Sequence, residues 1–315
     1  MVFIDEAEVR RLLPMGVAVR LMRETFEGLR NGASISQPRR RLVLPQSGSV
    51  LHAMAGAHGR YFGTKIYATN AKHGNANFLF WLLDAETAKP LALFEANWLG
   101  QIRTGAASGY ATDVLARPDA STHGVIGTGF QARSQVEAVA AVRKLKEVRV
   151  WSRQAANRER FARDCSEAFG LHVIATETAR EAVEGMDIVS TATWAKDPVL
   201  EAEWISPGTH VNAMGSNNPA RRELPADLLD RAEVIAADSV EQAKIESGDL
   251  LLAWGGPASV QWDRVADLQN ITKRPENRDA ITIFKSNGLG VEDVAAAAFV
   301  YEAAGHAVAH SGDES

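Results

Sequence analysis

Cationic side chains occur at three places in the first third of the chain where apolar or small residues surround them. Gln37-Pro-Arg-Arg-Arg41 lies at the entrance of an expected strand, Gly63-Thr-Lys65-Ile-Tyr67 inside another, and Gln101-Ile-Arg103 on an expected helix. An ammonium group inside an apolar strand is costly unless it meets a carboxylate or a carbonyl group. Each cation alone has an ordinary explanation, such as a solvated sheet edge for the arginines. Together they predict a pocket for a small carboxylate.

A glycine-rich turn follows a short apolar run in the middle of the chain. Val125-Ile126 precedes Gly127-Thr128-Gly129-Phe130-Gln131-Ala132, and a helical pattern follows. Gly127 permits a tight turn, Gly129 lets the backbone approach a pyrophosphate, and Ala132 allows close helix–strand packing. The first N–H groups of the helix then point at the phosphates, helped by the helix dipole. The whole turn, from Gly127 to Ala132, therefore predicts a dinucleotide site, with an ordinary turn as the alternative.

The end of the next expected strand bears on the choice of nicotinamide cofactor. An acidic residue about 20 positions beyond the glycines would bind the ribose hydroxyls, but this end reads Trp151-Ser152-Arg153. Ser152 can donate a hydrogen bond to a 2′-phosphate, and Arg153 and Arg158 can pair with it electrostatically. The sequence favours NADP(H), with NAD(H) as the alternative. A solvated helix start would also explain the arginines.

Two patterns of secondary structure surround these residues, and together they predict the α/β class. Before residue 96, helices at 5–13 and 17–29 precede turn-separated strands at 39–44, 50–56, 61–68, 77–83 and 91–95. A helix over 98–115 follows, and Pro118 marks a boundary. Beyond the glycine turn, short apolar strands alternate with helices, as in the parallel sheet of a Rossmann domain. Those strands are expected at 148–151, 173–174, 188–191, 210–212, 234–236 and 281–284. The final helix, from Gly290, can return to the first module.

The antiparallel module predicts self-association. Alternate residues of a strand face opposite sides of the sheet, and the module is too small to bury Phe78, Phe80, Trp81 and Leu83 by itself. A partner sheet could cover the second face. We therefore expect a homodimer.

Composition excludes several other classes of protein. The chain has 315 residues, 46% hydrophobic and 23% charged, with a net charge of −5, so nothing favours nucleic acid or a membrane surface as a partner. A single cysteine, Cys165, excludes an internal disulfide framework and fits a cytoplasmic location. No apolar run reaches the roughly 18 residues of a membrane span, and no signal peptide is evident. The histidines share no metal-ligand spacing, so we predict no metal.

Taken in order, the motifs resemble those of the ornithine cyclodeaminase/mu-crystallin family along nearly the whole chain. They are Pro38-Arg-Arg40, Gly63-Thr-Lys65, Arg103-Thr104-Gly-Ala-Ala107, the turn from Val125 to Ala132, Gly215-Ser-Asn-Asn-Pro219 with Arg222-Glu-Leu224, and Phe284-Lys-Ser-Asn-Gly-Leu289. The resemblance implies a Rossmann NAD(P)-binding domain, residues 119–288, inserted into an α+β substrate-binding and dimerisation domain, residues 1–118 with 289–315. It also implies homodimers and hydride chemistry on amino acids, 2-oxo acids or their imines.

The same resemblance implies roles for individual residues. Arg40 and Arg103 would hold the substrate carboxylate, and Lys65 would lie beside the reacting carbon. Thr104 would belong to the cofactor site, and Asn287 and Gly288 would lie near the nicotinamide. A further substrate-lining position would be Asn75.

Asn217 is the departure that bears on the reaction. Cyclodeaminases and the related alanine dehydrogenases carry an aspartate at this position, whereas ketimine reductases of the mu-crystallin type lack it. Aspartate can accept and return a proton, but an asparagine side chain only forms hydrogen bonds. Expelling ammonia from a diamino acid needs repeated proton transfers, while reducing a preformed imine needs one proton source.

The sequence therefore predicts an oxidoreductase that uses NAD(P)H to reduce a small imino or ketimine carboxylate, with Lys65 and Asn217 in its catalytic site. Two alternatives remain. One is an ornithine cyclodeaminase, which converts L-ornithine to L-proline and ammonia. The other is an NADP-dependent ligand-binding protein of the mu-crystallin type.

Overall fold

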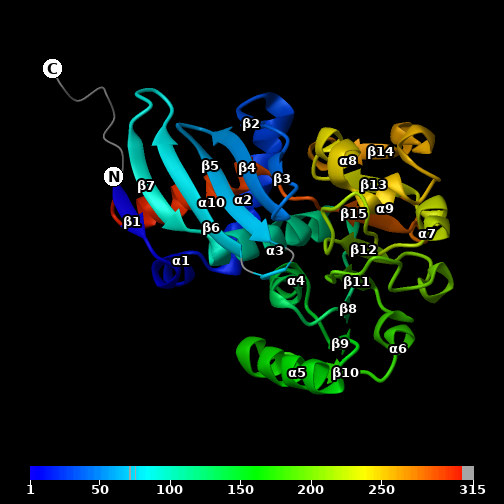
Figure 1. Cartoon of the computed structure of the whole chain (residues 1–315). Helices are drawn as coiled ribbons and strands as arrows, with labels where there is room; N and C mark the ends of the chain where they lie inside the picture. Colours follow the sequence, from blue (N-terminus) through cyan, green and yellow to red (C-terminus); the bar gives the residue numbers. More distant parts are fainter. Residues whose placement is uncertain (71, 75, 307–315) are drawn as a thin grey trace. The chain divides into compact units, whose positions relative to one another are not determined.

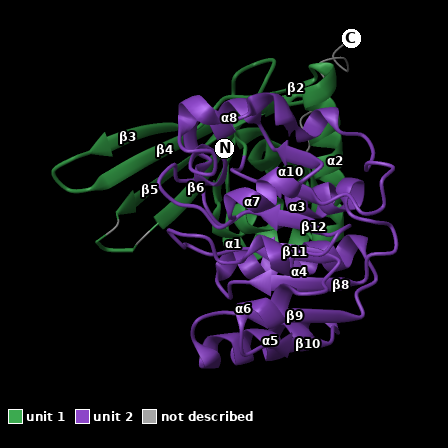
Figure 2. Cartoon of the chain, turned by 90° about the vertical axis from the view of Figure 1, so that its right-hand side faces the viewer, with its two compact units in different colours: residues 1–103, 289–315 green, residues 104–288 purple. Residues whose placement is uncertain are grey.

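The chain forms two compact units, each built around its own sheet. The structure, a computed structural model, describes residues 1–70, 72–74 and 76–306. One unit comprises Met1–Arg103 and Leu289–Ser315, and the other Thr104–Gly288 (Figures 1 and 2). The first boundary falls within helix α3 (Asn97–Leu115), whereas the expected boundary lay after residue 118. At Gly105, α3 lies close to α4 (Phe130–Val142). A Cβ atom on Gly105 would lie only 2.6 Å from the Ser134 carbonyl oxygen.

The first unit contains a seven-stranded sheet in the order β1-β7-β6-β5-β4, with β2 and β3 both paired to the last strand. All pairs are antiparallel except β1 with β7. The sequence predicted the five longer strands but neither β1 nor β2, which have only three residues each. The strands are β1 (Val2–Ile4), β2 (Ser34–Ser36), β3 (Arg40–Leu44), β4 (Ser49–His58), β5 (Tyr61–Asn70), β6 (Ala76–Asp84) and β7 (Pro90–Glu95).

Helix α10 (Gly290–Ala303) packs against β4 and β5 at backbone distance, as expected for a C-terminal helix that returns to the first module. A Cβ on Gly56 would overlap the backbone at Val291, and one on Gly290 would overlap the backbone of Ala55. Near the other end of the helix, the Tyr61 hydroxyl donates a hydrogen bond to Glu302 at 2.6 Å. The same unit holds α1 (Glu6–Leu12) and α2 (Met15–Asn31), and α2 packs against β2 and α10.

The two faces of this sheet differ in exposure, as the strand alternation predicts. Phe80, Leu82 and Phe94 are fully buried, whereas Leu79 and Trp81 remain 44% and 39% exposed. Leu42, Leu51 and Ile66 are exposed as well. The register places Ile66 opposite Leu79, on the face that α10 does not cover. We call the side chains of Leu42, Leu51, Ile66, Leu79 and Trp81 the open apolar face.

The second unit is a Rossmann-type parallel sheet in the order β10-β9-β8-β11-β12-β15-β13-β14. Strand order reverses between β8 and β11, and dinucleotides bind at the carboxyl ends of strands at such a reversal. The strands are β8 (Thr122–Ile126), β9 (Glu147–Trp151), β10 (Val173–Ala175), β11 (Ile188–Thr191), β12 (His210–Ala213), β13 (Val234–Ala237), β14 (Val265–Asp267) and β15 (Thr282–Lys285).

Helices connect these strands, and the long ones were predicted. Besides α4, the unit contains α5 (Ala155–Phe169), α6 (Ala179–Val183), α7 (Ala226–Arg231), α8 (Val240–Glu246) and α9 (Gly248–Leu251), and the 3₁₀ turns η1 (Ala202–Trp204), η2 (Pro257–Ser259), η3 (Trp262–Arg264) and η4 (Leu268–Asn270). The sequence did not predict the short helices α6 to α9, because segments of four to seven residues hold too few turns for a helical period. Within the described ranges, no helix has both the length and the apolar character needed to cross a bilayer.

Candidate functional site

Lys65 lies in a buried ionic cluster of the first unit. Its Nζ contacts both carboxylate oxygens of Asp293 at 2.9 Å. Arg103, from α3, donates from Nε to Asp293 at 3.2 Å and from a terminal nitrogen to Glu292 at 2.6 Å. Glu292 and Asp293 stand in the first turn of α10, where the helix dipole favours negative charge. The cluster therefore joins β5, α3 and α10.

Arg39 adds a third cation to this cluster. Its side chain is 5% exposed, and its positive charge acts on Lys65 and on His52. The charge of Arg39 therefore adds to that of Arg103 in the electrostatic environment of Lys65.

Arg40 lies on the other face of the sheet from Lys65. It pairs with Ala53 and, through it, with Ile66 on the open apolar face, and its side chain is exposed. Arg39, by contrast, is buried, and its charge acts on Lys65. The resemblance implies that Arg40 holds the substrate carboxylate; in this structure its side chain is exposed.

An aromatic row continues the Lys65 face of the sheet. The rings of His52 and Tyr67 stack at 4.3 Å, and Tyr67 stacks on Phe78 at 4.5 Å. Burial, with help from Arg41 and Arg39, lowers the pKa of His52 to about 4, so its ring is neutral near pH 7. His52 Nε2 lies 2.9 Å from the Thr69 hydroxyl. The rings of His52 and Tyr67 are nearly parallel and uncharged near pH 7, and Tyr67 is two residues from Lys65 on the same face of the sheet. Asn75, expected to line the substrate site, lies outside the described residues.

The glycine turn of the second unit has the geometry that a pyrophosphate requires. Gly127 has φ +113°, and a Cβ there would overlap the Ala192 carbonyl oxygen. Gly129 caps α4, and a Cβ there would meet nothing within 4 Å, so the space in front of the helix is open. Ala132 is fully buried behind it, and Phe130 is exposed. These features fit a dinucleotide phosphate at the start of α4.

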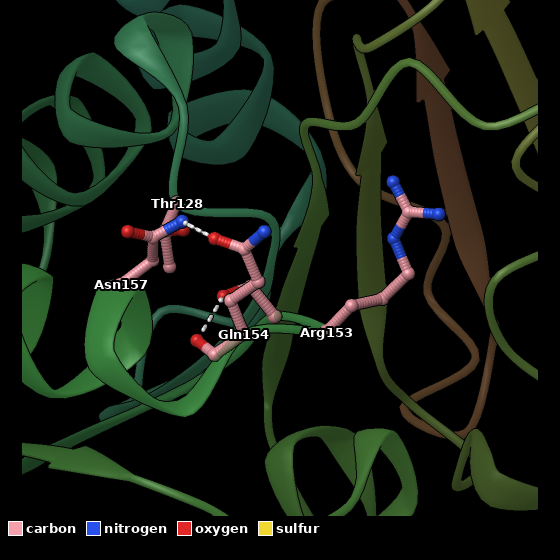
Figure 3. Close-up of a pocket in the computed structure, with 5 residues that line it drawn as sticks. Thr128, Arg153, Gln154 and Asn157 are labelled. Atoms are coloured by element: carbon pink, nitrogen blue, oxygen red, sulfur yellow. Dashed lines mark hydrogen bonds between the residues drawn. The ribbon is translucent and has the colours of Figure 1, made fainter.

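A pocket of about 510 Å³ lies at the carboxyl end of β9, lined by Thr128, Ser152, Arg153, Gln154 and Asn157. The side chains of Thr128, Gln154 and Asn157 gather on one side, and that of Arg153 extends away from them (Figure 3). Asn157 donates to the Gln154 side chain at 2.6 Å. The described lining residues include no carboxylate that would repel a phosphate.

Arg158, which was predicted to bind a 2′-phosphate together with Arg153, does not line the pocket. It is buried, and its guanidinium donates to the Ser152 carbonyl at 3.2 Å and to the Glu177 carboxylate at 2.7 Å. Its charge is therefore already paired. It supports the backbone of the pocket rather than lining it.

Asp238 holds the turn that contains Asn287 and Gly288. Its carboxylate accepts hydrogen bonds from the backbone N–H groups of both residues at 2.5 Å and from the Asn287 amide at 3.2 Å. Gly288 has φ +83°, which only glycine adopts readily. The structure thus places Asn287 and Gly288 at the carboxyl end of β15. Thr104 is buried in α3, beside the contact of Gly105 with α4.

Asn217 lies in the loop after β12, and buried carboxylates brace the residues around it. Glu223 accepts hydrogen bonds from the backbone of Gly215 at 2.7 Å and from the backbone and hydroxyl of Thr193 at 2.6 and 2.7 Å. Lys285 donates to the Ser216 carbonyl at 2.6 Å and pairs with Asp249 at 2.9 Å. The loop is therefore rigidly held. Lys65 and Asn217 belong to different units.

Several of these residues escaped the sequence analysis. Nothing in the sequence singled out Glu292 and Asp293, and Arg39 was one of three adjacent arginines. Asp238 had a usable signal, since an acid directly after a buried parallel strand lies at the ligand-binding edge. Among the described residues, no three histidine, cysteine or acidic side chains are grouped to hold a metal ion.

The model of the ornithine cyclodeaminase/mu-crystallin family matches residues 2–307. The chain belongs to this family. A Delta(1)-pyrroline-2-carboxylate reductase of Bacillus cereus is 39% identical over 232 residues, covering 72% of this chain and 71% of that protein.

Two solved structures of the family share the fold over nearly the whole chain. The Thermococcus litoralis Delta(1)-pyrroline-2-carboxylate reductase, in complex with NADH and L-proline, has a TM-score of 0.91, 31% identity and coverage of 96% and 97% of the two chains. An archaeal alanine dehydrogenase dimer with bound NAD has a TM-score of 0.89, 31% identity and coverage of 96% and 95%.

The buried position of Lys65 predicts a pH-dependent stability. Burial, together with Arg103 and Arg39 and against the pull of Asp293, lowers the pKa of Lys65 from 10.5 to about 8. Between these pH values the unfolded chain binds more protons than the folded chain, so stability rises with pH. Relative to Lys65→Met, the wild type should gain up to about 3 kcal/mol of unfolding free energy from pH 8 to 10.5.

Urea denaturation across this pH range measures the effect. Lys89→Met, at an exposed lysine, controls for the change in net charge. A difference between wild type and Lys65→Met that stays constant with pH would mean that the pKa of Lys65 is not lowered.

Proposed function

We propose that this protein uses a reduced nicotinamide cofactor to reduce a small 2-imino carboxylate to the corresponding amino acid. The observation that carries the proposal is the buried cluster in which Lys65 and Arg103 bind Glu292 and Asp293, with the charge of Arg39 acting on Lys65. A substrate carboxylate would bind to the cations of this cluster. The imine would then lie beside Lys65, along the neutral face of His52 and Tyr67.

The residues present fit the cofactor. The backbone of the Gly127–Ala132 turn and the start of α4 would hold the pyrophosphate, and Ser152, Arg153 and Asn157 the adenosine end. Thr104 would support the turn, and the Asn287–Gly288 turn would lie near the nicotinamide. When bound, the cofactor supplies the hydride.

Lys65 would supply the proton. Reduction of a neutral imine consumes one hydride and one proton, and an amine with a pKa of about 8 is protonated at neutral pH yet releases its proton readily. Arg39 and Arg103 would hold the carboxylate by charge-assisted hydrogen bonds. Asn217, in the second unit, can form hydrogen bonds through its amide but cannot take up a proton. Support for imine reduction also comes from the relatives named reductases.

The first experiment is a substrate panel with NADPH and NADH, covering cyclic imino carboxylates and 2-oxo acids with amines. Steady loss of nicotinamide absorbance is expected with at least one imine. Lys65→Ala should lower kcat on that imine by about 10²–10⁴-fold while cofactor binding persists. Lys65→Arg keeps the charge but should not restore turnover, because guanidinium does not give up its proton.

The other outcomes distinguish the alternatives. Asn217→Asp should retain imine reduction. Ammonia release from ornithine without net change in the nicotinamide would instead identify a cyclodeaminase, and no turnover across the panel would identify a binding protein. Near-wild-type kcat in Lys65→Ala would remove Lys65 from the mechanism.

We further propose that NADPH is preferred over NADH, although the two related structures hold NADH or NAD. The support is the uncharged and basic lining of the pocket after β9. Arg153→Ala should raise the Kd for NADPH by about 5- to 100-fold, as expected for a lost charge-assisted contact, and the Kd for NADH much less. Titration calorimetry with both cofactors measures this. Equal losses for the two would mean that Arg153 does not meet a 2′-phosphate.

The open apolar face supports a third proposal, that the protein is a homodimer in which a second copy covers this face. An exposed apolar surface on a sheet is costly in water, and one related structure is a dimer. Leu79→Glu should dissociate the dimer at micromolar concentration, as measured by sedimentation velocity. Leu252→Glu, at an exposed leucine of the second unit, is the matched control. A monomeric wild type would contradict the proposal.

A further inference from the structure

Trp194 has a large, solvent-exposed apolar side chain, and hydrogen bonds hold its backbone. It follows β11 by three residues, and its side chain is 63% exposed. A scattered exposed hydrophobic residue needs no explanation. Trp194 differs because the protein fixes its backbone and places a cation over its ring.

The support consists of two interactions. The preceding residue, Thr193, is bound by backbone and side chain to the buried Glu223. Arg221 donates to the Trp194 carbonyl at 2.7 Å, and its guanidinium carbon lies 4.9 Å from the centre of the indole ring. Arg221 thus contacts both the backbone and the ring of Trp194.

The position of Trp194 relates it to one half of the dinucleotide site. Ala192, two residues earlier, lies so close to Gly127 that a Cβ on this glycine would overlap the Ala192 carbonyl oxygen. The strand order reverses between β8 and β11. Ser152 and Arg153 follow β9, on one side of this reversal, and line the pocket suited to the adenosine. A dinucleotide that crosses the reversal must place its other half on the β11 side, where Trp194 stands.

We propose that Trp194, held by Arg221, forms a wall of the cofactor site and packs against the nicotinamide riboside of the bound dinucleotide. Trp194 makes the contact, and Arg221 is a positioning residue that acts through it. This inference rests on the proposed use of a nicotinamide cofactor. It adds a determinant of affinity on the half of the cofactor that the glycine turn does not hold.

The test compares the whole cofactor with its adenosine half. Titration calorimetry on the full chain measures the Kd of NADPH and of adenosine 2′,5′-bisphosphate, and of NADH and ADP in parallel. Trp194→Ala should raise the Kd of the dinucleotides by about 5- to 30-fold, as expected for one lost aromatic contact. The Kd of the mononucleotides should change less than about twofold. Arg221→Gln should have the same selectivity with a smaller loss, about 2- to 5-fold.

A second tryptophan–arginine pair provides the matched control. Trp254 lies 6.0 Å from the Arg264 guanidinium carbon and donates to Asp230 at 2.9 Å. Arg264 binds carbonyl oxygens at the end of α7, just before β13 begins, so this pair lies at the amino edge of the sheet. Trp254→Ala should leave the Kd of all four ligands unchanged.

The outcomes separate this inference from the proposed function. Equal losses for dinucleotides and mononucleotides in Trp194→Ala, or no loss for either, would overturn the role of Trp194 while leaving cofactor use intact. Failure of the wild type to bind any dinucleotide would overturn the proposed function, and this inference with it.

Discussion

The pairing of Lys65 and Arg103 with Glu292 and Asp293 is the interaction on which the first unit depends. The partners are 189 to 228 positions apart in the chain, and their side chains are almost entirely buried. Removing such charges from water costs several kcal/mol per ion unless each finds its partner in good geometry. The buried cations of β5 and α3 therefore find their partners on the C-terminal helix, which follows the whole second unit in the sequence. Contact of α10 with Gly56 at backbone distance makes the pairing possible.

In the second unit, buried carboxylates also hold distant segments together, but they bind backbone N–H groups more than cations. Asp238 accepts from the N–H groups of residues 287 and 288, and Glu223 from those of residues 193 and 215. Four loop residues at the carboxyl edge of the sheet are thus fixed by two buried side chains. Loops at this edge otherwise hold few apolar contacts, so a carboxylate beneath them supplies the rigidity that ligand binding requires.

The sequence predicted the features that depend on residues close together in the chain, but not those that depend on residues far apart. The glycine turn, the long strands and the position of Lys65 were readable, because each follows from local periodicity or from a motif within a few residues. The burial of Arg39 and the exposure of Arg40 were not, since they depend on where the pairing with β4 begins. The acidic partners of Lys65 could not be predicted either, because a contact between residues about two hundred positions apart produces no local sequence pattern. The first domain boundary falls inside a continuous helix, which no change in composition marks.

The state of the buried carboxylates also bears on the source of the proton. Burial and the nearby Asp249 raise the pKa of Glu223, but four hydrogen bonds from residues 191, 193 and 215 occupy its oxygens. Asp238 is occupied by the turn at residues 287 and 288, and Asp249 faces Lys285 and the backbone of Glu223. A protonation cycle on any of these would loosen the loop that it holds. These three carboxylates are thus unsuited to replace the aspartate that Asn217 displaces. Imine reduction, which needs one proton and no base to expel ammonia, is the reaction compatible with that arrangement.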